Sequence, residues 1–158
     1  MTKELISEGL RNAICEQIKH EFYNANLYLY ICGFLRNKGL DNIAKHFEGQ
    51  YKEELEHGME FFNLLTDLNA DVMIPEIDQI NIEIKSMKDV ATLYLEREIL
   101  TTKSIYELKL LSIGDKCPVA EEKMREMIAK QQHEYAEATT FADKVEIAPE
   151  WWQWLLMG

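Results

Sequence analysis

One glutamate in this chain occupies a helical position that normally belongs to a buried apolar residue. The helical face in question repeats every seven residues, through Phe47, Glu54, Phe61 and Leu68. Because three of these residues are large and apolar, the face is expected to point into a protein core. His57 lies three residues after Glu54 and projects from the same side of a helix. An unpaired buried carboxylate is costly unless it becomes neutral, and a divalent metal ion would compensate its charge.

Three further predicted helices carry polar residues in comparable places. Glu21 and Glu98 are each flanked, seven residues away on both sides, by apolar or aromatic residues, and Gln132 lies near the middle of a fourth stretch with Glu134 close by. Because each lies near the midpoint of its helix, all of them can meet at one level of a helical bundle. Glu54 and His57 alone would also fit a surface ion pair. Together, mainly oxygen ligands and one imidazole suit iron or manganese better than structural zinc or copper.

Glycine and proline positions divide the chain into four long helices and a short fifth. Ser7 and Asp41 are expected to be N-caps, Gly39 and Gly114 to end helices, and Pro118 to lie in a first helical turn. The predicted helices are approximately 7–37, 42–68, 87–113, 118–144 and 149–157.

Residues 69–86 interrupt the helical pattern. Isoleucines alternate with polar residues there, and Pro75 excludes a continuous helix. Because the chain offers no second strand as a partner, we expect an extended crossover, which at about 3.3 Å per residue is long enough to follow a long helix. Two helical hairpins joined by one long crossover make an all-α four-helix bundle, with residues 1–158 as one domain.

The C-terminal segment is unusually apolar. Trp151, Trp152 and Trp154 precede Leu155, Leu156 and Met157. So many large groups do not fit on one face of a bundle, and exposed apolar patches often mark interfaces. Packing within the monomer and contact with another copy are both open on the sequence.

Composition excludes several functions. The net charge of −11 argues against nucleic-acid binding through a basic surface. No signal segment or long apolar run predicts secretion or a membrane span. Cys15, Cys32 and Cys117 form no CxxC pair, which argues against a rubredoxin-type iron site and fits a reducing compartment, so we expect a cytoplasmic protein.

Three segments resemble the helix signatures of non-haem ferritins: EQIKHEFYNANLYLY from Glu16, YKEELEHGMEFF and EREILTTKSIYEL. The resemblance extends over nearly the whole chain and implies a ferritin-like bundle. It implies that Glu21, Glu54 and His57 bind a first iron, and that Glu54 bridges to a second iron completed by Glu98. It also implies that Gln132 hydrogen-bonds near the second iron and that Tyr28 is a one-electron donor beside the site.

Other positions depart from the family pattern. Glu53 matches an outer carboxylate that relays iron inward, whereas Gln131 and Tyr135 replace carboxylates of a third iron site and leave only Glu134. Haem is not expected, because Leu55 replaces the methionine found in the haem-binding relatives.

The resemblance implies a ferroxidase that oxidises Fe(II) with O2 or H2O2 at a di-iron centre and stores ferric mineral in a self-assembled cage of 24 subunits. A di-iron oxidase or peroxidase without mineral storage is the alternative, and a purely structural bundle is a third hypothesis. Neither nucleic acid nor a membrane is an expected partner.

Overall fold

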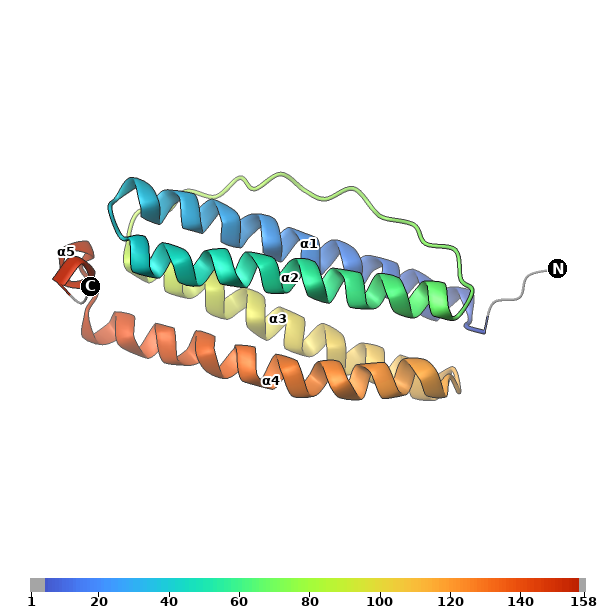
Figure 1. Cartoon of the computed structure of the whole chain (residues 1–158). Helices are drawn as coiled ribbons and strands as arrows, with labels where there is room; N and C mark the ends of the chain where they lie inside the picture. Colours follow the sequence, from blue (N-terminus) through green and yellow to red (C-terminus); the bar gives the residue numbers. More distant parts are fainter. Residues whose placement is uncertain (1–4, 157–158) are drawn as a thin grey trace.

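The computed structural model describes residues 5–156 and shows four long helices with a short one at the C-terminal end (Figure 1). The helices are α1 Glu8–Asn37, α2 Asp41–Asp67, α3 Met87–Gly114, α4 Pro118–Ile147 and α5 Trp151–Leu156. Helices α1 and α2 form one hairpin, α3 and α4 form the other, and α1 also packs on α3. The predicted all-α four-helix bundle is confirmed, and no strand occurs within residues 5–156.

The first hairpin confirms two of the predicted helix signals and corrects one. The Ser7 side chain accepts a hydrogen bond from the Leu10 amide and caps α1. Gly39 has φ +75°, the left-handed conformation that glycine adopts without strain, and terminates the helix. The assignment of Asp41 as N-cap was wrong, because Leu40 is the N-cap and Asp41 is already helical. Its carboxylate instead lies in the positively polarised first turn.

The second hairpin begins with a capping box between Ser86 and Asp89. Gly114 belongs to the last turn of α3, and Lys116 (φ 52°) adopts the left-handed conformation that reverses the chain. Pro118 is the first residue of α4, as predicted, and this helix continues to Ile147, beyond the predicted end near residue 144.

The segment between α2 and α3 is an extended crossover that runs along the bundle beside α1 (Figure 1). Val72, Ile80 and Ile82 pack partly onto the core and Ile84 is buried, whereas Ile74 is about half exposed. The alternation of isoleucines with polar residues therefore arises because one side of a single extended chain packs on the helices, without a partner strand. The backbone is fixed further by the Tyr30 hydroxyl, which donates to the Ile82 carbonyl at 2.7 Å.

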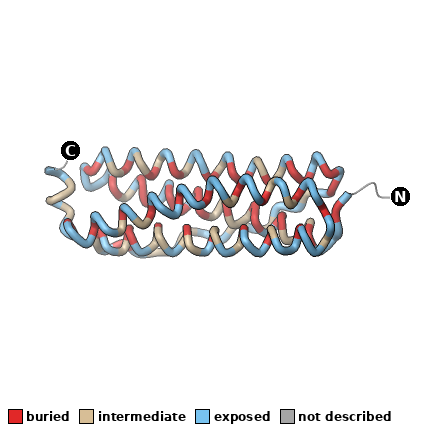
Figure 2. The backbone as a smooth tube through the Cα atoms, turned by 90° about the horizontal axis from the view of Figure 1, so that it is seen from below, coloured by how far each residue is buried: buried red, intermediate tan, exposed pale blue. Residues whose placement is uncertain are grey.

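Buried residues lie along the inward faces of all four long helices (Figure 2). They form two apolar clusters at opposite ends of the bundle. One includes Ile14, Phe61 and Met127, and the other includes Leu35 and Phe141. Such packing supplies most of the stability of long helices. Four of the polar residues predicted from the sequence are buried between the two clusters: Glu21, Glu54, His57 and Glu98.

The hairpin of α1 and α2 depends on a close approach at Gly58, next to His57. A Cβ at this position would overlap the ring of Phe22 on α1. We expect Gly58→Ala to destabilise the protein by about 1–3 kcal/mol, because the ring must leave a packed position. Gly49→Ala is the matched control, since its Cβ would meet open space, and it should stabilise α2 by about 0.5–1 kcal/mol. Urea unfolding of both variants tests this difference; equal effects would contradict it.

Helix α5 folds back onto the end of its own bundle. It begins at Trp151, two residues later than predicted. The Trp151 ring lies 5.7 Å from that of Phe34, and the Trp154 ring lies 5.5 Å from that of Phe141. Trp152, Leu155 and Leu156 are exposed, while Met157 lies outside the described residues. The tail therefore packs partly within the monomer, through two tryptophans. Its other three apolar side chains remain on the surface, where they could contact another copy.

Candidate metal centre

Five metal-ligating side chains meet near the middle of the bundle. They come from all four long helices and are all buried: Glu21, Glu54, His57, Glu98 and Glu134. The heptad spacing that places apolar residues inward on α1, α2 and α3 also turns their glutamates inward. The four helices thus bring together residues more than 100 positions apart in the chain.

The five side chains form two groups that share one residue. Glu21, Glu54 and His57 make the first group, and Glu54, Glu98 and Glu134 make the second, with donor atoms in each group within 4.8 Å of one another. His57 Nδ1 lies 3.9 Å from Glu21 Oε2 and 3.8 Å from Glu54 Oε2. Its Nε2 lies 3.4 Å from Glu134 Oε1. Glu54 is therefore placed where one carboxylate can bridge two ions.

Several oxygen atoms of this centre accept no hydrogen bond from an N–H or hydroxyl group of the residues that the structure describes. They are both oxygens of Glu54, Oε2 of Glu21 and Oε2 of Glu134, and all four atoms are buried. Buried carboxylate oxygens are otherwise nearly always paired. Unpartnered hard oxygen donors with one imidazole fit divalent iron or manganese. The residues present therefore fit the metal that the sequence predicted.

The carboxyl groups of the centre have raised pKa values. Burial raises the pKa of Glu21, with the charge of Glu54 as the next cause. Burial likewise raises the pKa of Glu54 and Glu98, and raises that of Glu134 to about 10. Carboxyl groups in this state hold protons that a metal ion must displace, so metal binding and proton release are coupled.

Glu98 is fixed by two hydrogen bonds. The Tyr28 hydroxyl donates to Oε1 at 2.6 Å, and Gln131 Nε2 donates to Oε2 at 2.6 Å. Gln132, the residue predicted from the sequence for this place, is exposed. The assignment of Gln132 was therefore wrong by one position: Gln131 is three residues before Glu134, on the buried face of α4.

This correction can be tested with two neighbouring substitutions. Gln131→Leu leaves Glu98 Oε2 without its donor, so we expect Zn(II) affinity at the second group to fall about 10–100-fold, the usual effect of removing a hydrogen bond to a ligand. Gln132→Leu should leave the affinity unchanged. Isothermal titration of the metal-free variants measures both. A loss in Gln132→Leu with none in Gln131→Leu would restore the original assignment.

Two more polar residues adjoin the centre. Gln17 Nε2 donates to Glu21 Oε1 at 3.0 Å; sequence reasoning missed Gln17, although its spacing of four residues from Glu21 was a signal. Glu53 is exposed and lines a groove of about 710 Å³ between α2 and α4, together with Glu134. Its role as an outer relay stays a prediction.

The fold and the site define a class of protein: four-helix bundles with a buried centre of carboxylates and one histidine. Residues 11–148 match the family model of the ferritin-like domain. The chain belongs to the non-haem ferritin family.

Curated relatives and solved structures agree with this membership. Ferritin BfrB of Mycolicibacterium smegmatis is 31% identical over 127 residues, which cover 80% of this chain and 70% of that protein. The bacterial non-heme ferritin of Staphylococcus aureus is 25% identical over 112 residues, which cover 71% and 68% of the two chains. An open pore ferritin from the hyperthermophilic archaeon Archaeoglobus fulgidus superposes with a TM-score of 0.91 at 27% identity, covering 96% and 94%.

Among the residues that the structure describes, no helix combines the length and apolarity needed to cross a membrane.

Proposed function

We propose that this protein is an iron-storage ferritin that oxidises Fe(II) to Fe(III) at paired positions in the bundle centre. The observation that carries the proposal is the pair of ligand groups sharing Glu54, with buried oxygens that lack donors. In this proposal Glu21, Glu54 and His57 hold one Fe(II), and Glu54, Glu98 and Glu134 hold the other. Two electrons, one from each iron, pass to O2 or H2O2, and this redox chemistry belongs to the metal.

The protein's own contribution is placement and charge. Four carboxylates compensate the charge of two divalent ions, and the hydrogen bonds from Gln17 and Gln131 orient Glu21 and Glu98. The groove lined by Glu53 and Glu134 gives ions a route from the surface to the centre. Ferric product leaves by the same route for mineral storage.

Storage requires assembly, and we propose a cage of 24 copies in the cytoplasm. Exposed apolar residues near the end of α3, such as Leu110 (68% exposed), and on α5 supply surfaces for contact between copies. All three cysteines are free and buried, which suits a reducing compartment.

Aerobic loading with excess Fe(II), followed by size-exclusion chromatography and iron analysis, tests the proposal. Storage predicts a large particle with tens of iron atoms or more per subunit. About two atoms per subunit in a small oligomer, one for each ligand group, would instead identify a di-iron oxidase or peroxidase. Near-zero iron would show a structural bundle.

A further inference from the structure

A row of aromatic side chains leads from the centre toward α5. It starts at Tyr28, whose hydroxyl donates to Glu98. The Tyr28 ring lies 5.5 Å from that of Tyr94, edge to face, and the Tyr94 ring lies 5.8 Å from that of Phe141. Phe141 is in turn 5.5 Å from the ring of Trp154. Two tyrosines and a tryptophan, the aromatic side chains that lose an electron most readily, are thus linked by consecutive ring contacts.

Tyr94 also has a proton acceptor. Its hydroxyl lies 3.3 Å from Nε2 of His46. Burial is the main cause that lowers the pKa of His46; Lys144 also lowers it, while Glu137 and Glu53 oppose the shift. The imidazole is therefore neutral near pH 7, and with its own proton on Nδ1 it accepts at Nε2. Burial likewise raises the pKa of Tyr94, so its hydroxyl keeps its proton until the ring is oxidised.

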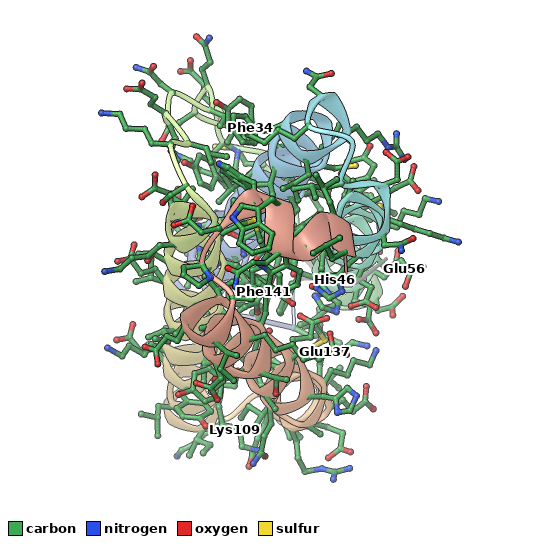
Figure 3. All side chains as sticks on the ribbon, turned by 90° about the vertical axis from the view of Figure 1, so that its left-hand side faces the viewer. Phe34, His46, Glu56, Lys109, Glu137 and Phe141 are labelled. Atoms are coloured by element: carbon green, nitrogen blue, oxygen red, sulfur yellow. The ribbon has the colours of Figure 1, made fainter. Side chains whose placement is uncertain are left out.

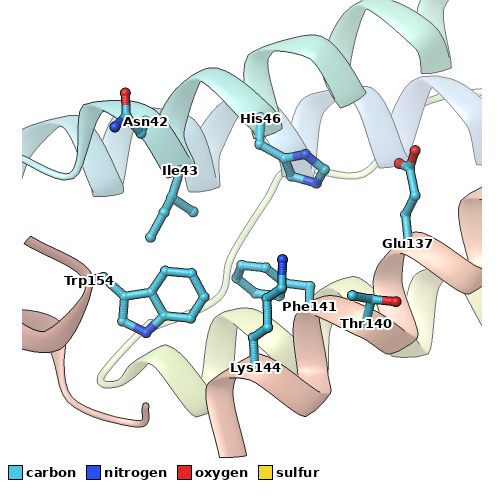
Figure 4. A pocket seen from close by; sticks show the side chains of 8 residues that line it. All are labelled: Asn42, Ile43, His46, Glu137, Thr140, Phe141, Lys144 and Trp154. Carbon is cyan, nitrogen blue, oxygen red and sulfur yellow. The ribbon is translucent and has the colours of Figure 1, made fainter. Parts of the chain in front are cut away.

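The far end of the row reaches solvent. Trp154 is half-buried and lines a pocket of about 490 Å³ between α2, α4 and α5, together with His46, Phe141 and Lys144 (Figure 4). Its indole nitrogen donates to the Ala148 carbonyl at 2.6 Å, which holds the ring in place. Viewed from this end of the bundle, His46 and Phe141 lie close together beneath α5 (Figure 3).

We propose that Tyr28, Tyr94 and Trp154 form a one-electron relay between the carboxylate centre and the pocket beside α5. When a one-electron oxidant takes an electron at Trp154, Tyr94 replaces that electron and its hydroxyl proton passes to Nε2 of His46. The products are a neutral tyrosyl radical and an imidazolium, so one electron and one proton are accounted for. The use of the relay in iron oxidation rests on the proposed function, whereas the relay itself can be tested in metal-free protein.

The test places a photo-oxidant beside Trp154. Asn42 is exposed and lines the same pocket, and because the native cysteines are buried, a thiol-reactive ruthenium polypyridyl complex will label Asn42→Cys selectively. Illumination with a sacrificial acceptor produces Ru(III), which takes one electron from the protein and returns to Ru(II). Transient absorption and electron paramagnetic resonance then distinguish tryptophanyl from tyrosyl radicals.

We expect a tyrosyl radical in the labelled protein, and Trp154→Phe should lower its yield by an order of magnitude. In Tyr94→Phe the tryptophanyl radical should persist instead. Trp152→Phe is the matched control, since Trp152 is exposed on the same helix, and it should leave the yield unchanged.

Heavy water should slow tyrosyl formation in the unsubstituted relay, because a proton moves with the electron. An unchanged yield in Trp154→Phe, or an equal loss in Trp152→Phe, would overturn the relay without affecting the proposed iron chemistry.

Discussion

Glu54→Gln is expected to abolish rapid Fe(II) oxidation while leaving the bundle folded. Glu54 is the residue common to both ligand groups, so its loss removes an anionic donor from two positions at once. Loss of a residue that merely supports a ligand costs about 10–100-fold, and we therefore expect a fall in initial rate of at least about 100-fold here. Stopped-flow absorbance after mixing with Fe(II) and O2 measures the rate.

The control is an exposed glutamate on α4 that lines neither the centre nor the groove. Glu146 is exposed, so Glu146→Gln changes the net charge equally and should keep more than about half of the wild-type rate, because exposed charges contribute little. If Glu54→Gln oxidised Fe(II) at the wild-type rate, the buried centre would have no part in the reaction. That result would support the hypothesis of a purely structural bundle.

The second large effect is stabilisation of the metal-free protein by Zn(II). Zn(II) at 100 to 1,000 times its dissociation constant should add about 3–4 kcal/mol to the free energy of unfolding. For a chain of this size that corresponds to a rise of about 6–16 °C in Tm. Calorimetry with and without Zn(II) measures the shift, and Glu54→Gln should lose most of it. An unchanged Tm in the wild type would rule out the site.

The same centre determines how the stability of the metal-free protein changes with pH. Folding raises the pKa of Glu21, Glu54, Glu98 and Glu134. Above the ordinary glutamate pKa of 4.5, the unfolded chain releases protons that the folded chain keeps. The contribution of these groups to stability therefore falls as pH rises, and for Glu134 this fall continues until the pH reaches its folded-state pKa of about 10. Zn(II) displaces those protons. Its effect on Tm should therefore be larger at pH 8 than at pH 5.5.

The sequence predicted the centre best where the heptad pattern was clearest. Glu21, Glu54 and Glu98 each replace an apolar residue between apolar neighbours seven positions away, so the direction of each side chain follows from helix geometry alone. On α4 the heptad pattern marks the inward face less clearly, and the predicted partner of the second group, Gln132, is one residue away from the actual one, Gln131. The buried positions Met127, Gln131 and Glu134 do follow helical spacing, and this spacing favours Gln131 over Gln132 as the inward residue.

Other features depend on contacts that a sequence pattern does not specify. Asp41 is a good N-cap residue by propensity, yet Leu40 takes that position, because the tight turn after Gly39 sets where the helix begins. The row from Tyr28 to Trp154 joins α1, α3, α4 and α5. No spacing along the chain predicts such a row, since it arises only when the helices pack.

Helix α5 also decides what tryptophan emission reports. All three tryptophans of the chain lie within its six residues, with Trp151 against Phe34 and Trp154 against Phe141. Emission will therefore follow the docking of this short helix, whereas circular dichroism will follow the four long ones. Midpoints that differ between the two probes, usually taken as a sign of a folding intermediate, would here mean that α5 detaches before the bundle unfolds.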